Sequence, residues 1–447
     1  MFPDGPVALD EMARRMEHVL AVSPAEATEI SWMEARRGQE SNGKRRRDSY
    51  QQHERTILIR VRESGRTGMH RTSAPGLSDL ENALREALAQ ARLADPTPAP
   101  LAPPGHDMAV VTDLHDPELA RMTPERARDT VQRLAEKGET ARLGWAEGRV
   151  AVASTSWGHG GGGLRRIAEV TSGWIEVVRS RQPGAGYAAA ASRSLAGLDP
   201  AGVFGRARRR QGPPDVVPPP EGPAPLLLSQ EATAGLLELL NRQAFTSESF
   251  HSGISFLRAR LGQPVFHPAI NLRDDPTDPR GLPFPFDLLG AACRPVDLVA
   301  DGVALTPAVD DRLARELGLA PTPHRVAPDA AIPAHLFLVP GSASEESLLR
   351  AAEGGLWAAA LEPLEVYDAH ALRFRAVIRG ARQVTGGALG RSVPDLVWED
   401  ALPSVLWRVL AVGSELVPIA TGAGLFRATT APMLAVGDVS GFRFAAD

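Results

Sequence analysis

A proline-rich segment near the middle of the chain is the strongest constraint on how the chain can fold. Residues 212–225 read GPPDVVPPPEGPAP. Proline cannot continue an α-helix and cannot donate a hydrogen bond inside a sheet, so this segment is expected to be an extended connector. The chain has 447 residues, more than a single hydrophobic core usually organises. We therefore expect an N-terminal α/β domain over residues 1–211, a linker over 212–225 and a C-terminal domain over 226–447.

The N-terminal domain is predicted to contain two copies of one structural plan. A shorter proline-rich run over residues 95–105 separates a unit at about 1–94 from a unit at about 107–211. In each unit the apolar periodicity predicts a helix, strands, a glycine turn, a short strand and a closing helix. The expected helices are Leu9–Val22, Leu77–Leu93, Thr123–Lys137 and Asp199–Arg209; the expected longer strands are Thr28–Glu40, Thr56–Arg62, Arg142–Ser156 and Ala168–Arg179; and the expected turns are Gly65–Gly68 and Gly184–Gly186.

The C-terminal domain is expected to begin with a helix and to continue mainly as short strands. Apolar residues at helical spacing predict a helix over Gln230–Gln243. Beyond it, short apolar runs such as His335–Val339, Leu372–Ile378 and Val405–Val412 are interrupted by Gly, Pro and Asp. This texture is typical of short strands joined by turns, with Asp310–Leu317 as a further helix. The predicted fold class is α+β, with a two-unit helix/strand domain followed by a β-rich C-terminal domain.

Composition excludes several classes of function. The formal net charge of -5 argues against a dedicated nucleic-acid binder, which normally carries a basic field. The single cysteine, Cys293, excludes an intrachain disulfide framework and a zinc site built from several cysteines. We find no signal peptide and no run of about twenty apolar residues that could cross a bilayer. A cytoplasmic protein without a membrane partner is therefore expected.

Several short motifs follow the predicted helix in a fixed order. They are Asp274-Asp275-Pro276, Phe286-Asp287-Leu288-Leu289-Gly290, Asp301-Gly302-Val303, Leu317-Gly318 with Thr322-Pro323-His324, Val384–Gly387, Ala411–Leu416 and Ala431–Leu434. Their collinear order, over roughly residues 226–444, resembles that of the TldD/PmbA family. Leu289 and Gly387 replace acidic residues of the family motifs and Pro323 replaces a glycine, so the chain resembles a divergent member.

The resemblance draws attention to a motif that this chain lacks. Catalytic members resemble metallopeptidases through HExxxH on the first helix of the C-terminal domain, where two histidines bind zinc and the glutamate activates a water. In the most natural register, Glu238, Leu239 and Gln243 stand at these positions. No histidine lies between His159 and His251, so a shift of register does not restore the motif. The resemblance thus implies no catalytic, metal-ligating or cofactor-binding residue in this chain, and it leaves the substrate-binding residues unassigned.

Lack of the motif places the chain with the PmbA-like (TldE-like) branch, whose members are not catalytic alone. Such a subunit pairs with a zinc-bearing TldD-like subunit to enclose a metallopeptidase chamber. By resemblance, the substrates are unfolded or small peptides, including those matured into peptide natural products. Two alternatives stay open: a homodimer that binds a peptide or small molecule without hydrolysis, and an enzyme repurposed for peptide natural-product biosynthesis.

One glycine-rich run and two basic runs could indicate nucleotide or phosphate binding, but each has a simpler structural explanation. Residues 157–163 (WGHGGGG) satisfy a GxGxxG spacing, but the following segment predicts a strand where a dinucleotide site needs a helix. A hairpin loop is therefore favoured. The basic runs Lys44–Arg47 and Arg206–Arg210 are expected to be a solvated hairpin tip and a helix C-terminus that suits the helix dipole.

Acidic and histidine-containing patterns in the C-terminal domain also have structural explanations. Residues 273–278 (RDDPTD) carry three carboxylates that could bind a hard cation, although capping of the proline turn is favoured. Cys293 with His267 or His324 could form a nucleophile and base, but no local signature supports a thiol enzyme. His335 and His370 are expected to be satisfied structural groups.

Overall fold

The N-terminal domain is organised around one six-stranded sheet in the order β3-β2-β1-β4-β5-β6. All neighbouring strands in it are antiparallel. The computed structural model describes residues 6–43, 49–96, 108, 110–155, 163–179, 184–420 and 427–445. The strands of this sheet are β1 (Ala27–Ser41), β2 (Tyr50–Glu63), β3 (Arg66–Thr72), β4 (Glu139–Ser154), β5 (Leu164–Arg179) and β6 (Gly186–Ser192). Because β1 pairs with β4 along most of its length, the two units share one continuous sheet.

Two pairs of helices pack on this sheet. The first unit contributes α1 (Leu9–Val22) and α2 (Leu77–Leu93), and the second contributes α4 (Pro124–Leu134) and α6 (Pro200–Arg210), with the short helices α3 (Pro117–Ala120) and α5 (Leu195–Leu198) beside them. Each unit therefore has the order helix, three strands, helix. Thr123 and Asp199 cap α4 and α6 by accepting hydrogen bonds from backbone N–H groups, and proline occupies the first turn of both helices.

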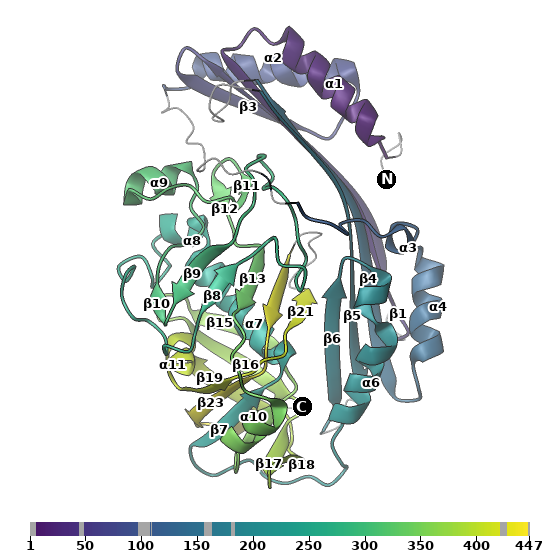
Figure 1. Ribbon diagram of the computed structural model, residues 1–447, viewed down its shortest axis with the longest axis vertical. Coiled ribbons are helices and arrows are strands. Elements are labelled where there is room, and N and C mark those ends of the chain that lie inside the picture. Colours follow the sequence, from purple (N-terminus) through teal and green to yellow (C-terminus); the bar gives the residue numbers. More distant parts are fainter. Residues whose placement is uncertain are drawn as a thin grey trace.

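The C-terminal domain is mainly β-structure and lies on the side of the long sheet away from α4 and α6 (Figure 1). Two of its sheets have the strand orders β10-β9-β8-β13-β22-β21 and β18-β17-β14-β7-β23-β20. A four-stranded sheet and a two-stranded sheet complete the domain, and the α+β class expected from the sequence is confirmed. The first two sheets consist of β8 (Leu272–Asp274), β9 (Val296–Ala300), β10 (Val303–Ala304), β13 (His335–Leu338), β21 (Val417–Ala420) and β22 (Ala428–Ala431), and of β7 (Ala224–Leu228), β14 (Leu356–Ala358), β17 (Arg382–Thr385), β18 (Ala388–Ser392), β20 (Val409–Val412) and β23 (Leu434–Val439).

The remaining elements of this domain are short. The four-stranded sheet contains β15 (Ala360–Asp368), β16 (Arg373–Arg379), β19 (Leu396–Ala401) and β24 (Arg443–Phe444). The two-stranded sheet contains β11 (Arg325–Ala327) and β12 (Ala330–Ala331). The helices are α7 (Gln230–Leu240), α8 (Ser247–His251), α9 (Asp311–Leu317), α10 (Glu345–Ala351) and α11 (Leu402–Trp407). The apolar run at 405–412 is a correction to the expected strands, because its first part completes α11 and only Val409–Val412 is a strand. None of the described helices is long and apolar enough to cross a membrane.

The alternation of residues along β1 explains how the two domains meet. Ile30 and Trp32 face α1 and α2 and are fully buried in the core of the first unit. The side chains of Met33 and Ala35 point to the other face of the sheet, as alternation in a strand requires, and pack with Phe284 and Phe286 of the C-terminal domain. Both faces of β1 are therefore apolar in this region.

Two of the four glycines that were expected in turns lie instead in the edge strands β3 and β6, where they allow close packing of a helix. Gly65 and Gly184 do lie in turns with positive φ. Gly68 and Gly186, however, are inside β3 and β6, where a Cβ would lie 2.0 Å from the carbonyl oxygen of Ala87 in α2 and 1.9 Å from that of Ala207 in α6. The glycines permit close approach of a helix to an edge strand, and the device occurs once in each unit.

Replacing Gly186 with alanine is expected to destabilise the protein by about 1–3 kcal/mol, because the new methyl group forces α6 away from β6. Urea unfolding followed by circular dichroism measures this change. Gly222→Ala is the matched control, since a Cβ there meets no atom within 4 Å. Equal stability of the two variants would contradict the packing explanation.

Candidate functional site

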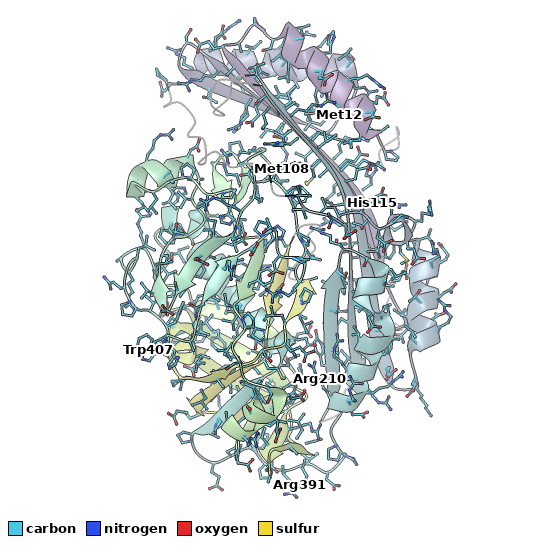
Figure 2. All side chains as sticks on the ribbon, in the orientation of Figure 1. Met12, Met108, His115, Arg210, Arg391 and Trp407 are labelled. Atoms are coloured by element: carbon cyan, nitrogen blue, oxygen red, sulfur yellow. The ribbon has the colours of Figure 1, made fainter. Side chains whose placement is uncertain are left out.

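The first helix of the C-terminal domain is anchored to the N-terminal domain at its start. Ser229 caps α7 by accepting a hydrogen bond from the backbone N–H of Ala232. Glu231, in the first turn, accepts a hydrogen bond from the backbone N–H of Ala189 in β6 at 3.0 Å. It also forms an ion pair with Arg210 at 2.8 Å. Arg210 lies at the junction between the domains in Figure 2. These contacts fix the direction in which α7 enters the C-terminal domain.

The end of α7 departs from the α-helix that the sequence predicts over Gln230–Gln243. The α-helix ends at Leu240 and continues as a π-helix, η2 (Asn241–Phe245). Residues five apart on an α-helix project about 140° from each other, since each residue turns by about 100°. A π-turn, with hydrogen bonds from i to i+5, brings such residues closer to one face and is frequent at functional sites. The helix thus has the winding that suits a motif with ligands five positions apart.

The side chains at the three motif positions do not fit a zinc ion. Glu238 is 11% exposed, and its Oε1 accepts from Arg242 Nε at 2.8 Å and from Arg427 Nη2 at 3.0 Å. Leu239 packs against the main core of the domain and offers no ligand atom. Gln243 supplies an amide where a neutral imidazole or carboxylate is needed. Across the described residues, no group of three or more His, Cys, Asp or Glu side chains is arranged to hold a metal.

A cavity of about 220 Å³ lies between the N-terminal sheet and the loops of the C-terminal domain. Met33 and Ala35 of β1 form its wall on the side of the N-terminal domain, beside the Arg37–Glu54 ion pair. Phe284 and Phe286, with ring centroids 5.1 Å apart, form part of the opposite wall. Arg427, which holds Glu238, also lines the cavity, so the end of α7 is connected to this space by one side chain.

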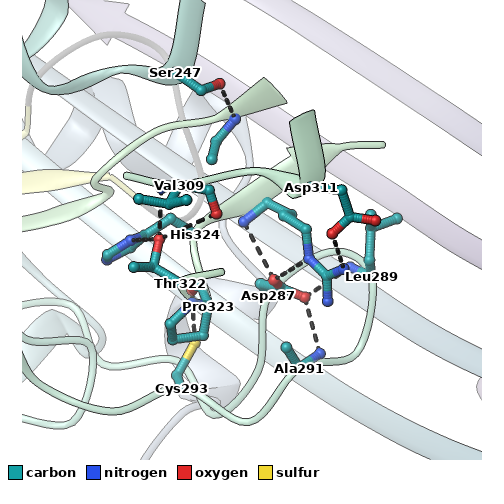
Figure 3. A network of polar contacts seen from close by, with 12 residues as sticks. Ser247, Asp287, Leu289, Ala291, Cys293, Val309, Asp311, Thr322, Pro323 and His324 are labelled. Atoms are coloured by element: carbon teal, nitrogen blue, oxygen red, sulfur yellow. Dashed lines mark hydrogen bonds and ion pairs between the residues drawn. The ribbon is translucent and has the colours of Figure 1, made fainter. Parts of the chain in front are cut away.

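A buried hydrogen-bond network forms the polar part of the cavity wall. Figure 3 shows the part of it around His324 and Thr322, with the contacts of Asp287 beside it. His324 contacts Asp274 Oδ2 through Nε2 at 3.0 Å and Thr322 Oγ1 through Nδ1 at 2.8 Å. Asp274 Oδ1 accepts from the backbone N–H of His335 at 2.6 Å. Burial opposes ionisation of Asp274, but the charge and hydrogen bonds of His324 and the proximity of His335 outweigh it, and the pKa of this carboxyl falls below its ordinary value.

A second carboxylate, Asp287, holds the adjoining loop. Its Oδ1 accepts from the backbone N–H groups of Leu289 and Ala291, at 3.0 and 2.9 Å. Its Oδ2 accepts from Nε of the buried Arg325 at 3.1 Å. These hydrogen bonds hold the turn through the backbone of Leu289 and do not use its side chain. The turn therefore accommodates leucine at the position where the family motif carries an acid.

His335 is a correction to the expected satisfied structural histidine. It is buried in the cavity wall, and its Nδ1 has no hydrogen-bond partner among the described residues. Burial lowers its pKa from 6.5 to about 4, and the charge of Asp274 only partly opposes this. His335 is therefore neutral at physiological pH. His370, by contrast, is exposed.

Acid is expected to destabilise the fold through His335. Between pH 6.5 and about 4 the unfolded chain binds a proton at this residue and the folded chain does not, so stability falls as the pH falls. The loss reaches about 3 kcal/mol across this window. Urea unfolding at pH 7, 5.5 and 4.5 measures it. His335→Gln should flatten this pH dependence and His370→Gln should leave it unchanged; a steep dependence that persists in His335→Gln would assign it to another group.

Cys293 is not paired with His267 or His324, in agreement with the absence of a local signature for a thiol enzyme. The Cys293 thiol donates to the carbonyl oxygen of Pro323 at 3.8 Å, and both ring nitrogens of His324 are occupied by Asp274 and Thr322. Burial, together with the charges of Asp287 and Asp274, raises the pKa of the thiol well above its ordinary value. His267 instead accepts from the backbone N–H of Ala269. The thiol therefore stays protonated and has no base.

The other singled-out patterns have structural roles where the structure describes them. Asp275 caps the proline turn by accepting from the backbone N–H of Thr277, as predicted, whereas Asp274 belongs to the buried network. In the basic run at the end of α6, Arg208 and Arg210 are ion-paired with Glu139 and Glu231. The basic run 44–47 and most of the glycine-rich run 157–163 lie outside the described residues.

The cavity brings together three motifs that the sequence shows only as a collinear series. Asp274, Asp287 and His324 come from three different motifs and line the same wall. Arg325, Arg427 and His335 were not singled out as functional by sequence reasoning. Of these, only Arg325 could have been suspected from the sequence, because it directly follows the Thr322-Pro323-His324 motif.

Comparisons with known proteins agree with this arrangement. Residues 221–441 match the model of the PmbA/TldA metallopeptidase C-terminal domain. No curated protein matches the chain. Among solved structures, a proposed modulator of a DNA gyrase from Thermotoga maritima superposes with a TM-score of 0.79 at 20% identity, covering 97% of this chain and 100% of that one.

Two further solved structures share the fold over nearly the whole chain. TldE from Thermococcus kodakarensis has a TM-score of 0.77 at 18% identity, covering 95% of this chain and 99% of that one. A proposed modulator of DNA gyrase from Bacteroides thetaiotaomicron has a TM-score of 0.72 at 16% identity, covering 98% and 99%. The C-terminal domain of the chain therefore belongs to the PmbA/TldA metallopeptidase C-terminal domain family, and the two domains together share the fold of these three structures.

Proposed function

We propose that this chain is a TldE-like subunit that completes the chamber of a two-subunit metallopeptidase without supplying its metal. The observation that carries the proposal is the state of α7. The helix and its π-turn are present, but Glu238 is paired with two arginines and Leu239 and Gln243 replace the remaining motif residues. Zinc and the water-activating glutamate then come from a TldD-like partner, and the substrates are unfolded or small peptides in the cytoplasm.

The division of labour follows from the chemistry of the motif. Peptide hydrolysis at a zinc site needs metal ligands with an open coordination position and a carboxylate that is free to take a proton from water. The only carboxylate at the motif positions, Glu238, shares one oxygen between Arg242 and Arg427. Both contacts occupy Oε1, so this oxygen is not free to take a proton from a water molecule.

Coexpression with an HExxxH-bearing relative from the same genome tests the pairing. We expect the two chains to copurify, and we expect the pair to cleave an unstructured peptide in a chelator-sensitive reaction while each chain alone does not. A chain that forms only homodimers, with no gain in cleavage on mixing, would refute the proposal. A chain that cleaves alone in the presence of chelator would point to repurposed chemistry.

A further inference from the structure

Three residues that line the cavity between the domains carry polar atoms that no described group of the protein uses as a hydrogen-bond partner. Nη2 of Arg325, Nε of Arg427 and Nδ1 of His335 are buried and have no hydrogen-bond partner within the described parts of the chain. All three residues line the same cavity. A guanidinium N–H can only donate, so the two arginines need an acceptor. Buried polar groups without partners are rare in proteins, and a cluster of three calls for an explanation.

The carboxylates beside these arginines are already shared with other donors. Asp287 accepts from three backbone N–H groups as well as from Arg325. The other carboxylate near Arg325, Asp311, lies 3.9 Å away, beyond hydrogen-bond distance. Glu238 divides its Oε1 between Arg427 and Arg242. The two guanidiniums therefore retain donor capacity for an acceptor from outside the chain.

His335 supplies a hydrogen-bond acceptor, in contrast to the two arginine donors. It hydrogen-bonds the backbone of Leu282, and since Nδ1 has no partner, this contact uses Nε2. A neutral imidazole that donates through Nε2 presents Nδ1 as an acceptor. The cavity thus offers two donors and one acceptor, set among the apolar side chains of Met33, Phe284, Phe286 and Ile332. Apolar walls with a few convergent polar groups are typical of small-molecule sites.

We propose that this cavity binds a carboxylate that carries a neighbouring N–H group and an apolar side chain. The carboxylate accepts hydrogen bonds from Arg325 and Arg427, the N–H donates to His335, and the side chain packs against Met33 and the two phenylalanines. Such a group is either an apolar amino acid or the C-terminal residue of a peptide. The inference goes beyond the proposed subunit role and does not depend on it.

Calorimetric titration of the purified chain with matched probes tests the inference. N-acetyl-leucine should bind at least ten times more tightly than N-acetyl-leucinamide, which lacks the carboxylate. Free leucine and a tripeptide ending in leucine distinguish the two sources: tighter binding of the tripeptide assigns the site to peptide C-termini, and tighter binding of leucine assigns it to the amino acid. No binding of any probe, or equal affinity for the acid and the amide, would overturn the proposal.

Variants locate the binding in this cavity. Arg427→Gln removes one donor and Ala334→Phe fills the space without changing a charge, and each should weaken binding of N-acetyl-leucine at least tenfold. Arg375→Gln is the matched control, because Arg375 is 59% exposed on the four-stranded sheet, and it should bind like the unaltered chain. Circular dichroism confirms that the variants are folded. Unchanged affinity in both cavity variants would place the binding elsewhere and refute the assignment.

Discussion

Replacing Asp274 with alanine is expected to cost about 3–5 kcal/mol of folding stability, because a buried charge partner is removed. The Asp274 side chain is fully buried and that of His324 is 2% exposed. Without the carboxylate, Nε2 of His324 and the backbone N–H of His335 lose their acceptor, and no water replaces it cheaply in a buried site. Asp274 lies in β8 and His335 in β13, and these two strands are paired at the centre of a six-stranded sheet, so the substitution also weakens that sheet.

Urea unfolding measures this effect against a surface control. Asp297→Ala removes a carboxylate that is 64% exposed and only loosely paired with Arg273, so its cost should stay below about 1 kcal/mol. Asp274→Asn keeps the shape and one acceptor oxygen and should fall between the two. If Asp274→Ala is no more harmful than Asp297→Ala, the buried network does not hold the loops around the cavity.

Replacing Arg193 with methionine is expected to cost about 2–4 kcal/mol, because three buried carbonyl groups lose their donors. The guanidinium donates to Thr171 in β5 at 3.1 Å, and across the domain junction to Leu282 at 3.0 Å and Pro283 at 2.9 Å. Burial lowers the pKa of Arg193 to about 9, so the group remains charged at neutral pH. Methionine also removes the cost of burying a charge, and this gain offsets part of the lost stability. The expected loss is therefore smaller than the sum of three broken hydrogen bonds.

Hydrogen exchange gives a readout specific to the junction. In Arg193→Met, amides of the loop around Leu282 and of the cavity wall at Phe284 should exchange faster, while those of α1 and α2 should not change. Arg391→Met is the matched control, because Arg391 is exposed at the end of the molecule (Figure 2). Uniform protection in both variants would show that Arg193 does not tie the domains together.

Local sequence patterns account well for the N-terminal domain. The long strands have regular alternation, and Thr123 with Pro124, and Asp199 with Pro200, are helix-start signals that the structure confirms. The predicted turn at Gly186 is wrong, because Gly186 lies in β6 and its close packing against α6 depends on the position of that helix in the fold. The π-turn after Leu240 has no signal in its residues, since a change in hydrogen-bond register follows from tertiary packing.

The candidate cavity was less accessible to sequence reasoning. Its motifs were recognised as a collinear series, yet Asp274 and His324 are fifty positions apart and meet only in the fold. Arg193 reaches residues ninety positions away in the other domain. Such contacts leave no local periodicity, so neither the network nor the free donors of Arg325 and Arg427 could be read from spacing.

Peptide cleavage by the reconstituted pair, with one glutamate changed at a time, tests the central claim most directly. If this chain supplies no catalytic group, Glu238→Gln should leave the cleavage rate within about twofold of the unaltered pair, a change that signals no lost transition-state contact. Changing the glutamate of the partner's HExxxH motif to glutamine should slow cleavage by about 10²–10⁴-fold, as loss of a general base does. Cleavage that survives the partner's change and is lost with Glu238→Gln would contradict the account.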